Sequence, residues 1–178
     1  KAYSVRYEHY KNSVYVRGLI EFSNYCKNDC TYCGISIHNK ELTRYHMTPE
    51  EVIKTAEIGY SLGFRTFVMQ GGEDTSFTDD KFAAIISSIK TQFPEAAVTL
   101  SIGERSKESY QKLYDAGADR FLIRHETINK KLYEKLHPKM SYENRIKSLF
   151  DLKDIGFQVG TGFMVGVPGQ EIEDIAND

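Results

Sequence analysis

Apolar residues along this chain fall into short continuous runs that alternate with stretches of helical periodicity. The runs are rich in Val, Ile, Phe and Tyr, which is typical of buried β-strands. Strands are predicted at residues 14–22, 65–70, 97–102, 120–124 and 157–164. A helical stretch follows each run, so the pattern predicts repeated strand–helix units.

Capping residues mark the ends of the predicted helices. Thr48, Pro49 and Glu51 predict a helix start, with Thr48 as N-cap, Pro49 at the first helical position and Glu51 completing a capping box. Gly63 is the predicted stop of this helix. Further helices are predicted at residues 79–91, 107–116, 129–136 and 142–155, and a last one begins after residues 166–170.

Strand–helix units of this kind predict an α/β fold with a parallel sheet. Polar residues gather just after the ends of the strands, where (β/α)8 TIM-type barrels build their active sites. We therefore expect a barrel of which this chain holds about the first five units. Five units do not close an eight-fold barrel, so residues 1–178 are interpreted as a single core domain that is a fragment of a longer barrel. An open partial barrel is the alternative, and residues 1–13 are expected to be a solvated lead-in segment.

Charge and composition narrow the class of protein. The 23 basic and 25 acidic side chains give a net charge of −2, without a basic stripe, so neither nucleic acid nor an anionic membrane is an expected partner. No apolar run approaches the roughly 20 residues that span a bilayer. An odd number of closely spaced cysteines favours a reducing compartment over a disulfide framework, and the cytoplasm is the predicted location.

The three cysteines of the chain, Cys26, Cys30 and Cys33, follow the first predicted strand within eight positions. Thiolate is the ligand that iron–sulfur clusters and zinc prefer. A closed structural site takes four protein ligands, whereas three leave one coordination position free. Two interpretations remain open from the residues alone: an iron–sulfur cluster with one open iron, or a Cys3His zinc site in an interaction module, with His38 or His46 as the fourth ligand.

The C-x3-C-x2-C spacing, with the aromatic Tyr32 before the last cysteine, resembles the signature of the radical S-adenosylmethionine (SAM) superfamily. Gly71, Gly72, Glu73 and Asp74, at the end of the second predicted strand, are similar to its glycine-rich loop. The resemblance implies a 4Fe–4S cluster held by the three cysteines, with the open iron chelated by SAM. It also implies reductive cleavage of SAM to methionine and a 5′-deoxyadenosyl radical.

Longer strings narrow the resemblance, and together they cover essentially the whole chain. V-Y-V-R-G-L-I-E-F-S-N, R-Y-H-M-T-P-E-E, V-T-L-S-I-G-E, A-G-A-D-R-F-L-I-R-H-E-T and M-V-G-V-P-G-Q resemble the HydE-type maturases. This implies a role in assembling the di-iron active site (the H-cluster) of [FeFe] hydrogenase. Another small-molecule radical SAM enzyme, of the biotin synthase or methylornithine synthase type, is the alternative.

Polar residues at the strand ends are the remaining candidates. Thr99 and Ser101 alternate on one face of a strand, and Arg124 and Glu126 share a direction if their strand continues. A charge at a barrel mouth is costly unless paired, which favours a ligand or an ion pair. The structural alternatives are hydroxyls bonded to the backbone and an Arg124–Glu126 or Arg145–Glu126 pair.

The resemblance implies a role for each candidate. For SAM binding it implies Tyr32, Gly71, Gly72, Glu73, Asp74, Ser101, Glu126 and Arg145. For a small carboxylate-bearing substrate it implies Thr99, Arg124 and Met164. It further implies an electron donor such as ferredoxin or flavodoxin, and other hydrogenase maturases as partners. Surface exposure for Arg145, a core position for Met164, solvation for Glu104 and packing for His125 are the structural alternatives.

Overall fold

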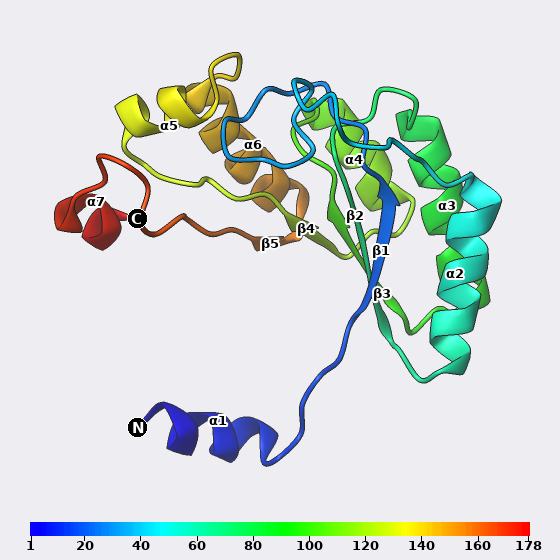
Figure 1. The fold of residues 1–178 in the computed structure, drawn as a ribbon. Helices are drawn as coiled ribbons and strands as arrows, with labels where there is room; N and C mark the ends of the chain where they lie inside the picture. The colour runs from blue at the N-terminus through cyan, green and yellow to red at the C-terminus, as the bar shows by residue number, and fades with distance from the viewer.

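Five parallel strands form one sheet whose order, β1-β2-β3-β4-β5, follows the chain (Figure 1). The computed structural model describes residues 1–178. Its strands are β1 (Gly18–Ser23), β2 (Thr66–Gly71), β3 (Ala97–Ser101), β4 (Arg120–Leu122) and β5 (Gln158–Gly160). Its helices are α1 (Ala2–Tyr10), α2 (Pro49–Ser61), α3 (Asp79–Gln92), α4 (Lys107–Asp115), α5 (Lys130–Leu136), α6 (Tyr142–Ile155) and α7 (Ile172–Asn177).

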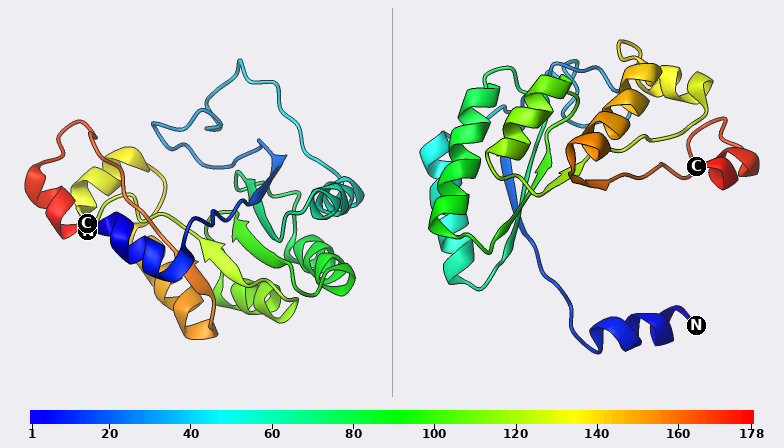
Figure 2. Two further views of the ribbon diagram at one scale, coloured as in Figure 1. Left: turned by 90° about the horizontal axis from the view of Figure 1, so that it is seen from below. Right: turned by 180° about the vertical axis from the view of Figure 1, so that it is seen from behind.

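The helices α2, α3, α4 and α6 cover one side of the sheet, and each packs against the next (Figure 2). Consecutive strands side by side, with the crossover helices all on one side, are the arrangement of a β/α barrel. The predicted barrel-type α/β fold is confirmed as five units of an open arc. No helix of the chain combines the length and the apolar character that crossing a membrane requires.

The start of α2 matches the prediction. The Thr48 hydroxyl accepts from the Glu51 amide at 3.2 Å, and the Glu51 carboxylate accepts from the Thr48 amide at 2.7 Å. Pro49 occupies the first turn, and Gly63 follows the helix with φ +98°. This capping box stabilises the point where the chain leaves the cysteine-bearing loop and enters the helical layer.

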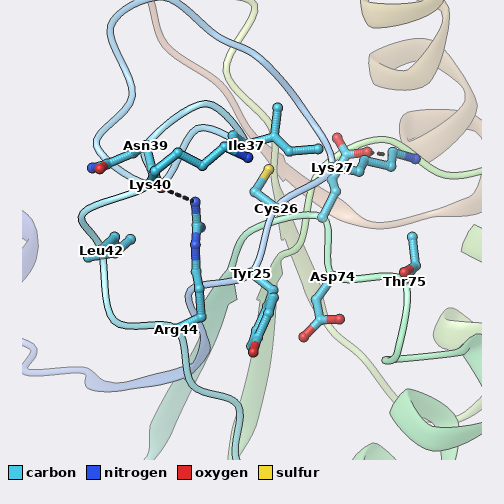
Figure 3. Close-up of a pocket in the computed structure, with 11 residues that line it drawn as sticks. Tyr25, Cys26, Lys27, Ile37, Asn39, Lys40, Leu42, Arg44, Asp74 and Thr75 are labelled. Carbon is cyan, nitrogen blue, oxygen red and sulfur yellow. Dashed lines mark hydrogen bonds and ion pairs between the residues drawn. The ribbon is translucent and has the colours of Figure 1, made fainter.

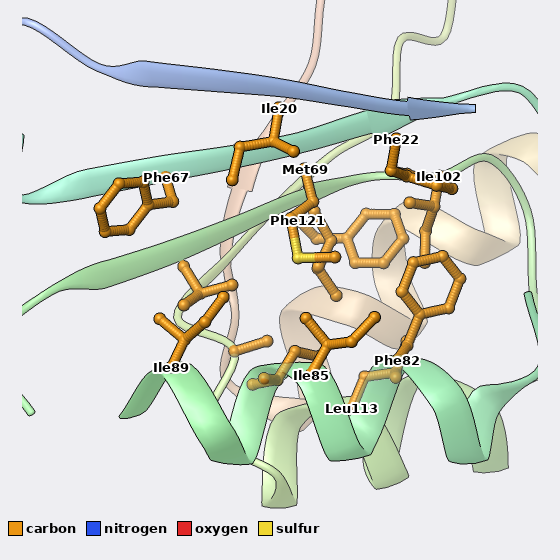
Figure 4. Close-up of a cluster of buried hydrophobic side chains, with 14 of the residues drawn as sticks. Ile20, Phe22, Phe67, Met69, Phe82, Ile85, Ile89, Ile102, Leu113 and Phe121 are labelled. Carbon is orange, nitrogen blue, oxygen red and sulfur yellow. The ribbon is translucent and has the colours of Figure 1, made fainter. Parts of the chain in front are cut away.

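The core lies between the sheet and the helices (Figure 4). Phe22 on β1 packs against Phe77 and Phe82 with ring centroids 4.6 and 5.2 Å apart, and Phe82 begins the buried face of α3. Each such side chain contributes about 1.5–3 kcal/mol on burial. Because strand side chains alternate in direction, the opposite face of the same strands is left for polar residues.

One row of residues across that opposite face is polar. The register aligns Glu21 of β1 with Gln70 of β2, and Gln70 with Ser101 of β3. The next row toward the strand starts aligns Val68 with Thr99. The predicted alternation of Thr99 and Ser101 is therefore present, with Ser101 nearer the strand ends.

The first strand is shorter than predicted, and the lead-in segment is helical. Sheet pairing begins where Gly18 meets Phe67, and residues 14–17 have no neighbouring strand. The preceding helix α1 stands apart from the sheet and buries no residue (Figure 1). It was missed because it has no apolar stripe, although its solvated character agrees with expectation.

Strands β4 and β5 also end earlier than predicted. Beyond Leu122 and Gly160 the two segments stay in contact through single bonds, from the Ile123 amide to the Gly160 carbonyl at 3.0 Å and from the Glu126 amide to the Gly162 carbonyl at 3.1 Å. Glu126 has φ +65°, which no regular strand accommodates. The irregular backbone carries the polar residues that follow β4.

Candidate cofactor site

The three cysteines lie on a long loop, residues 24–47, which joins β1 to α2 at the C-terminal ends of the strands (Figure 1). All three thiols are half-buried and form no disulfide. The base of the loop is closed by Asn24, whose side chain accepts from the Tyr45 amide at 2.7 Å and donates to the Thr43 carbonyl at 2.9 Å. The loop thus returns to its starting point before α2 begins.

Arg44 holds this loop together from within. Its guanidinium donates to the carbonyl oxygens of Ile35 at 2.8 Å, Ser36 at 2.7 Å and Asn39 at 3.3 Å, and also to that of Asn24. The planar fork of arginine offers five donors in fixed directions, which suits several carbonyls at once. One side chain therefore fixes the path of the segment that contains Cys30 and Cys33.

The end of α5 supports the same loop from outside. The Thr31 amide donates to the Leu136 carbonyl at 2.9 Å, and the Tyr32 hydroxyl lies 2.9 Å from Nε2 of His137. The side chain of His137 is buried, with its ring stacked on Tyr133. These contacts place the last two cysteines relative to a helix that follows them by a hundred residues.

The thiols are close enough to affect one another electrostatically. Burial, together with the neighbouring Cys33 and Cys26 thiolates, raises the pKa of the Cys30 thiol from 9.0 to about 12. No three His, Cys, Asp or Glu side chains are close enough together to hold a single metal ion.

His38 and His46, the candidates for a fourth zinc ligand, contact carboxylates. Nε2 of the exposed His38 lies 4.0 Å from Oδ2 of Asp29. Nδ1 of His46 lies 3.6 Å from Oδ2 of Asp74, and its ring packs on that of Tyr25. A Cys3His ligand set is not assembled in this structure.

The glycine-rich loop after β2 contacts the cysteine loop closely. A β-carbon on Gly72 would stand 2.2 Å from the Tyr25 carbonyl oxygen, and one on Gly71 would stand 2.7 Å from the Phe22 ring. The Lys27 amide donates to the Glu73 carbonyl at 3.2 Å. Because glycine has no side chain, the backbones of the two loops can pack directly against each other at these positions.

The Glu73 side chain is held from two directions. Its Oε2 lies 3.0 Å from Nζ of Lys27, and its Oε1 accepts from the Glu104 amide at 3.0 Å. It passes over Gly103, which has φ +76° and where a β-carbon would lie 2.2 Å from the Glu73 side chain. Glu73 therefore ties the loops after β1, β2 and β3 together.

Asp74 lines a cavity of about 440 Å³ that Cys26 and Arg44 also line (Figure 3). Its carboxylate accepts from the Ser23 hydroxyl at 2.6 Å and the Ser76 amide at 2.8 Å. Burial raises the pKa of Asp74, but these hydrogen bonds outweigh it and leave the pKa below its usual value. The pattern is that of a carboxylate that orders its own loop.

A second cavity, of about 470 Å³, opens at the strand ends beside the cysteine loop. The predicted site residues that line it are Cys26, Tyr32, Cys33, Gly71, Gly72, Glu73, Ser101, Arg124, Glu126 and Arg145. Asp74, Thr99, Met164 and Cys30 are not among its lining residues. The structure thus brings most of the predicted site together around one hollow.

Glu126 is the buried acid of this cavity, with 5% of its surface exposed. Its Oε1 lies 3.3 Å from the Tyr32 hydroxyl, while its Oε2 has no hydrogen-bond partner. Neither Arg124 nor Arg145 pairs with it, so the alternative interpretation as a structural ion pair does not hold in this structure. A buried carboxylate with one unpartnered oxygen, on a backbone with φ +65°, indicates a position that a ligand completes.

Arg145, on α6, is buried beside the cavity and pairs with Glu104 at 2.5 Å. It also donates to the Arg124 carbonyl, so it braces the segment after β4. Burial disfavours the guanidinium cation, but the Glu104 carboxylate outweighs this and raises the pKa of Arg145. The Arg124 side chain is exposed and makes no ion pair.

Three other candidates lie around this centre. Thr99 is buried one row below Ser101. Met164 is half-buried, and its amide donates to the Glu126 carbonyl at 2.9 Å. His125 is buried, with Nδ1 2.9 Å from the Thr161 hydroxyl, as its predicted packing role requires.

Comparison with known proteins decides the family. Residues 20–178 match the family model described as the Radical SAM superfamily. The chain belongs to the radical SAM superfamily. Radical SAM enzymes use a 4Fe–4S cluster and SAM, as the resemblance implied.

Individual relatives refine the comparison. The chain is 45% identical, over 98% of its length, to the [FeFe] hydrogenase maturase subunit HydE of Thermotoga maritima, of which the match covers 49%. It is 30% identical, over 97% of its length, to 3-methylornithine synthase of Methanosarcina acetivorans, also covering 49%. The crystal structure of methylornithine synthase (PylB) superposes with a TM-score of 0.90 at 28% identity, covering 98% of this chain and 52% of that one. The chain thus spans about half the length of these relatives.

The residues of this radical SAM chain suit the cofactors of the superfamily. Three half-buried thiols on one loop, with the pKa of Cys30 raised by burial and by the other two, form a donor set that iron would stabilise. The unpartnered Oε2 of Glu126 offers an acceptor for a SAM hydroxyl or ammonium group. The close approach of Gly72 to Cys26 leaves backbone groups at the cavity wall rather than a side chain.

Sequence reasoning missed several members of the site. Glu21 and Gln70 line the cavity from within their strands, and only the sheet register reveals them. Arg44 and His137 act on the cysteine loop through backbone carbonyls and a phenol. One signal was available in the sequence. Gly103 directly follows a predicted strand, and a glycine in that position often marks the close approach of another segment, here the Glu73 side chain.

Proposed function

We propose that this chain carries the SAM-cleaving centre of a hydrogenase maturase of the HydE type, which acts in assembly of the H-cluster. The observation that carries the proposal is the 45% identity to the Thermotoga maritima subunit over nearly the whole chain, against 30% to methylornithine synthase. The cavity geometry supports it, because the cysteine loop, the glycine-rich loop and Glu126 converge on one space.

Cys26, Cys30 and Cys33 would hold a 4Fe–4S cluster and leave one iron open. The bound cluster and SAM supply an electron and a sulfonium whose cleavage yields methionine and a 5′-deoxyadenosyl radical. The chain's own part is to fix the loop, which Arg44 does through the carbonyls of Ile35 and Ser36.

The remaining lining residues would orient SAM. Backbone groups at Gly71 and Gly72 are accessible at the cavity wall, and Glu73 is already fixed by Lys27. Ser101 offers a hydroxyl, Glu126 an unpartnered carboxylate oxygen and Arg145 a buried cation. Tyr32, on the cysteine loop, has its hydroxyl 3.3 Å from Oε1 of Glu126, and Asp74 would act indirectly by ordering its loop.

Among the residues that line the cavity, Arg124 is best suited to bind a substrate carboxylate, because its guanidinium makes no ion pair within the protein. Thr99, one row further from the strand ends than Ser101, and Met164, on the segment after β5, would also contact that substrate. We further propose an electron donor such as ferredoxin or flavodoxin and other hydrogenase maturases as partners, with neither nucleic acid nor a membrane.

The test begins with anaerobic reconstitution with iron and sulfide. We expect four irons and four sulfides at the cysteine loop, and release of 5′-deoxyadenosine and methionine on addition of SAM and a reductant. Zinc without labile sulfide would instead support the interaction-module interpretation. The maturase assignment is tested by adding the protein to a hydrogenase maturation mixture that lacks only HydE, where hydrogenase activity should return.

Methylornithine synthase chemistry is the second candidate, favoured by the TM-score of 0.90 to that enzyme. Incubation of the reconstituted protein with lysine, SAM and a reductant would yield methylornithine under this alternative. The same incubation with dethiobiotin tests the biotin synthase type. We expect neither product.

A further inference from the structure

Tyr32 and His137 meet at the edge of the cavity, next to Glu126. The Tyr32 hydroxyl oxygen lies 2.9 Å from Nε2 of His137 and 3.3 Å from Oε1 of Glu126. A phenol has one proton, so it donates to only one of these neighbours. Which neighbour receives the proton decides whether Glu126 has any donor within the protein.

The other ring nitrogen of His137 settles the direction. Nδ1 lies 3.1 Å from the carbonyl oxygen of Tyr133, which accepts only, so Nδ1 carries a proton. The ring has 1% of its surface exposed, and burial lowers the pKa of His137 from 6.5 to about 4. In the neutral ring Nε2 is therefore an acceptor, and the Tyr32 hydroxyl donates to it.

Glu126 is then left without a donor on either oxygen. Its Oε2 has no partner, and its Oε1 faces the lone pairs of the Tyr32 hydroxyl rather than its proton. A buried carboxylate in this state gains most from a ligand that brings its own hydroxyl or ammonium donors.

We propose that His137 is a positioning residue of the SAM site: by accepting the Tyr32 hydroxyl, it keeps that proton away from Glu126 and leaves the carboxylate for the ligand. The proposal rests on the proposed function, because SAM is the ligand whose hydroxyl or ammonium groups Glu126 would accept. His137 does not line the cavity; it acts through Tyr32.

The substitution His137→Phe keeps a stacked ring but removes the acceptor. The Tyr32 hydroxyl then donates its proton to Oε1 of Glu126 in a charge-assisted hydrogen bond. SAM must displace this bond in order to bind Glu126. We expect the SAM dissociation constant of the cluster-loaded protein, measured by calorimetry, to rise about tenfold, equivalent to about 1.4 kcal/mol. Tyr32→Phe alone should change it less than threefold, and His137→Gln, which offers an amide oxygen in place of Nε2, should restore most of the affinity.

The double variant His137→Phe/Tyr32→Phe is decisive, because the competing proton is gone. We expect its SAM affinity to return to within about threefold of wild type. A merely structural role of His137 would leave the double variant as weak as His137→Phe or weaker, which would overturn the proposal. The electron paramagnetic resonance spectrum of the reduced cluster should change on SAM addition in the double variant as it does in wild type.

A measurement independent of SAM uses nitrogen-15 NMR of the histidine rings. We expect His137 as the neutral tautomer with its proton on Nδ1; a proton on Nε2 would overturn the proposal even if His137→Phe fails to fold. If the cluster-loaded wild type binds no SAM, the proposed function fails, whereas the tautomer still reports where the Tyr32 proton lies.

Discussion

Gly72 lies so close to Cys26 that a β-carbon on it would stand 2.6 Å from the β-carbon of Cys26. The contact joins the ends of two adjacent parallel strands at the first of the three thiols. Gly72→Ala should therefore displace Cys26 or the Tyr25 carbonyl. We expect a loss of about 1–3 kcal/mol in the free energy of unfolding and less than half the wild-type iron and sulfide per chain after reconstitution.

Gly34→Ala is the matched control, because Gly34 follows Cys33 in the same loop and its β-carbon would meet nothing within 4 Å. We expect wild-type iron content and stability. Equal losses in both variants would show that the loop tolerates no added methyl group anywhere, and that the Gly72 contact has no special role.

Cys30→Ala should remove one of three ligands from the cluster. Two thiolates do not hold a 4Fe–4S cluster firmly, so we expect loss of the brown chromophore and of 5′-deoxyadenosine release. Iron and sulfide analysis together with chromatography of the products checks both. A variant that still cleaves SAM would show that the ligand assignment is wrong.

Arg44→Lys keeps the charge but loses the fork that reaches the carbonyls of Ile35, Ser36 and Asn39. We expect faster hydrogen exchange at residues 24–39 in the protein without cofactor, and slower cluster assembly. Lys40→Gln, at an exposed residue of the same loop, is the control and should match wild type. Unchanged exchange in Arg44→Lys would contradict the bracing role.

Acid should destabilise the protein through His137. Its pKa is near 6.5 when unfolded and about 4 when folded, so the unfolded chain binds a proton first. The stabilisation from the neutral ring is complete above pH 6.5 and is lost as the pH falls toward 4. Denaturant titrations of the protein without cofactor at pH 7 and pH 5 should show a larger loss for wild type than for His137→Gln. Equal losses would mean that the ring titrates alike in both states.

The sequence predicted the strand–helix order because periodicity and capping are local properties. Helix α6, over Tyr142–Ile155, has the predicted bounds, since Ser141 caps it and Gly156 ends it in the left-handed region. The extent of β1 was not predictable in the same way. A strand ends where its neighbour does, and the register that leaves residues 14–17 unpaired depends on where β2 begins.

In the candidate site, too, locally encoded features could be predicted from the sequence, whereas those that depend on contacts between distant segments could not. Residues next to a motif or directly after a strand, such as Glu73, Ser101 and Glu126, were found, and the structure places them at one cavity. Their partners were not. The resemblance implied SAM binding for Arg145, with a Glu126 pair as the alternative. In the structure Arg145 pairs with Glu104, 41 residues earlier on a different unit. Such pairs carry no periodic signal and arise only when the strands close into an arc.

The bond from the Thr31 amide to the Leu136 carbonyl has a consequence for the order of folding. The two residues are 105 positions apart, so the cysteine loop lacks this support until the fourth unit and α5 have been synthesised and have docked. A ribosome-bound chain that ends before α5 would expose three thiols on a loop that lacks this support, open to oxidation. Loading of iron is accordingly expected to be a late event, after most of these residues have left the ribosome.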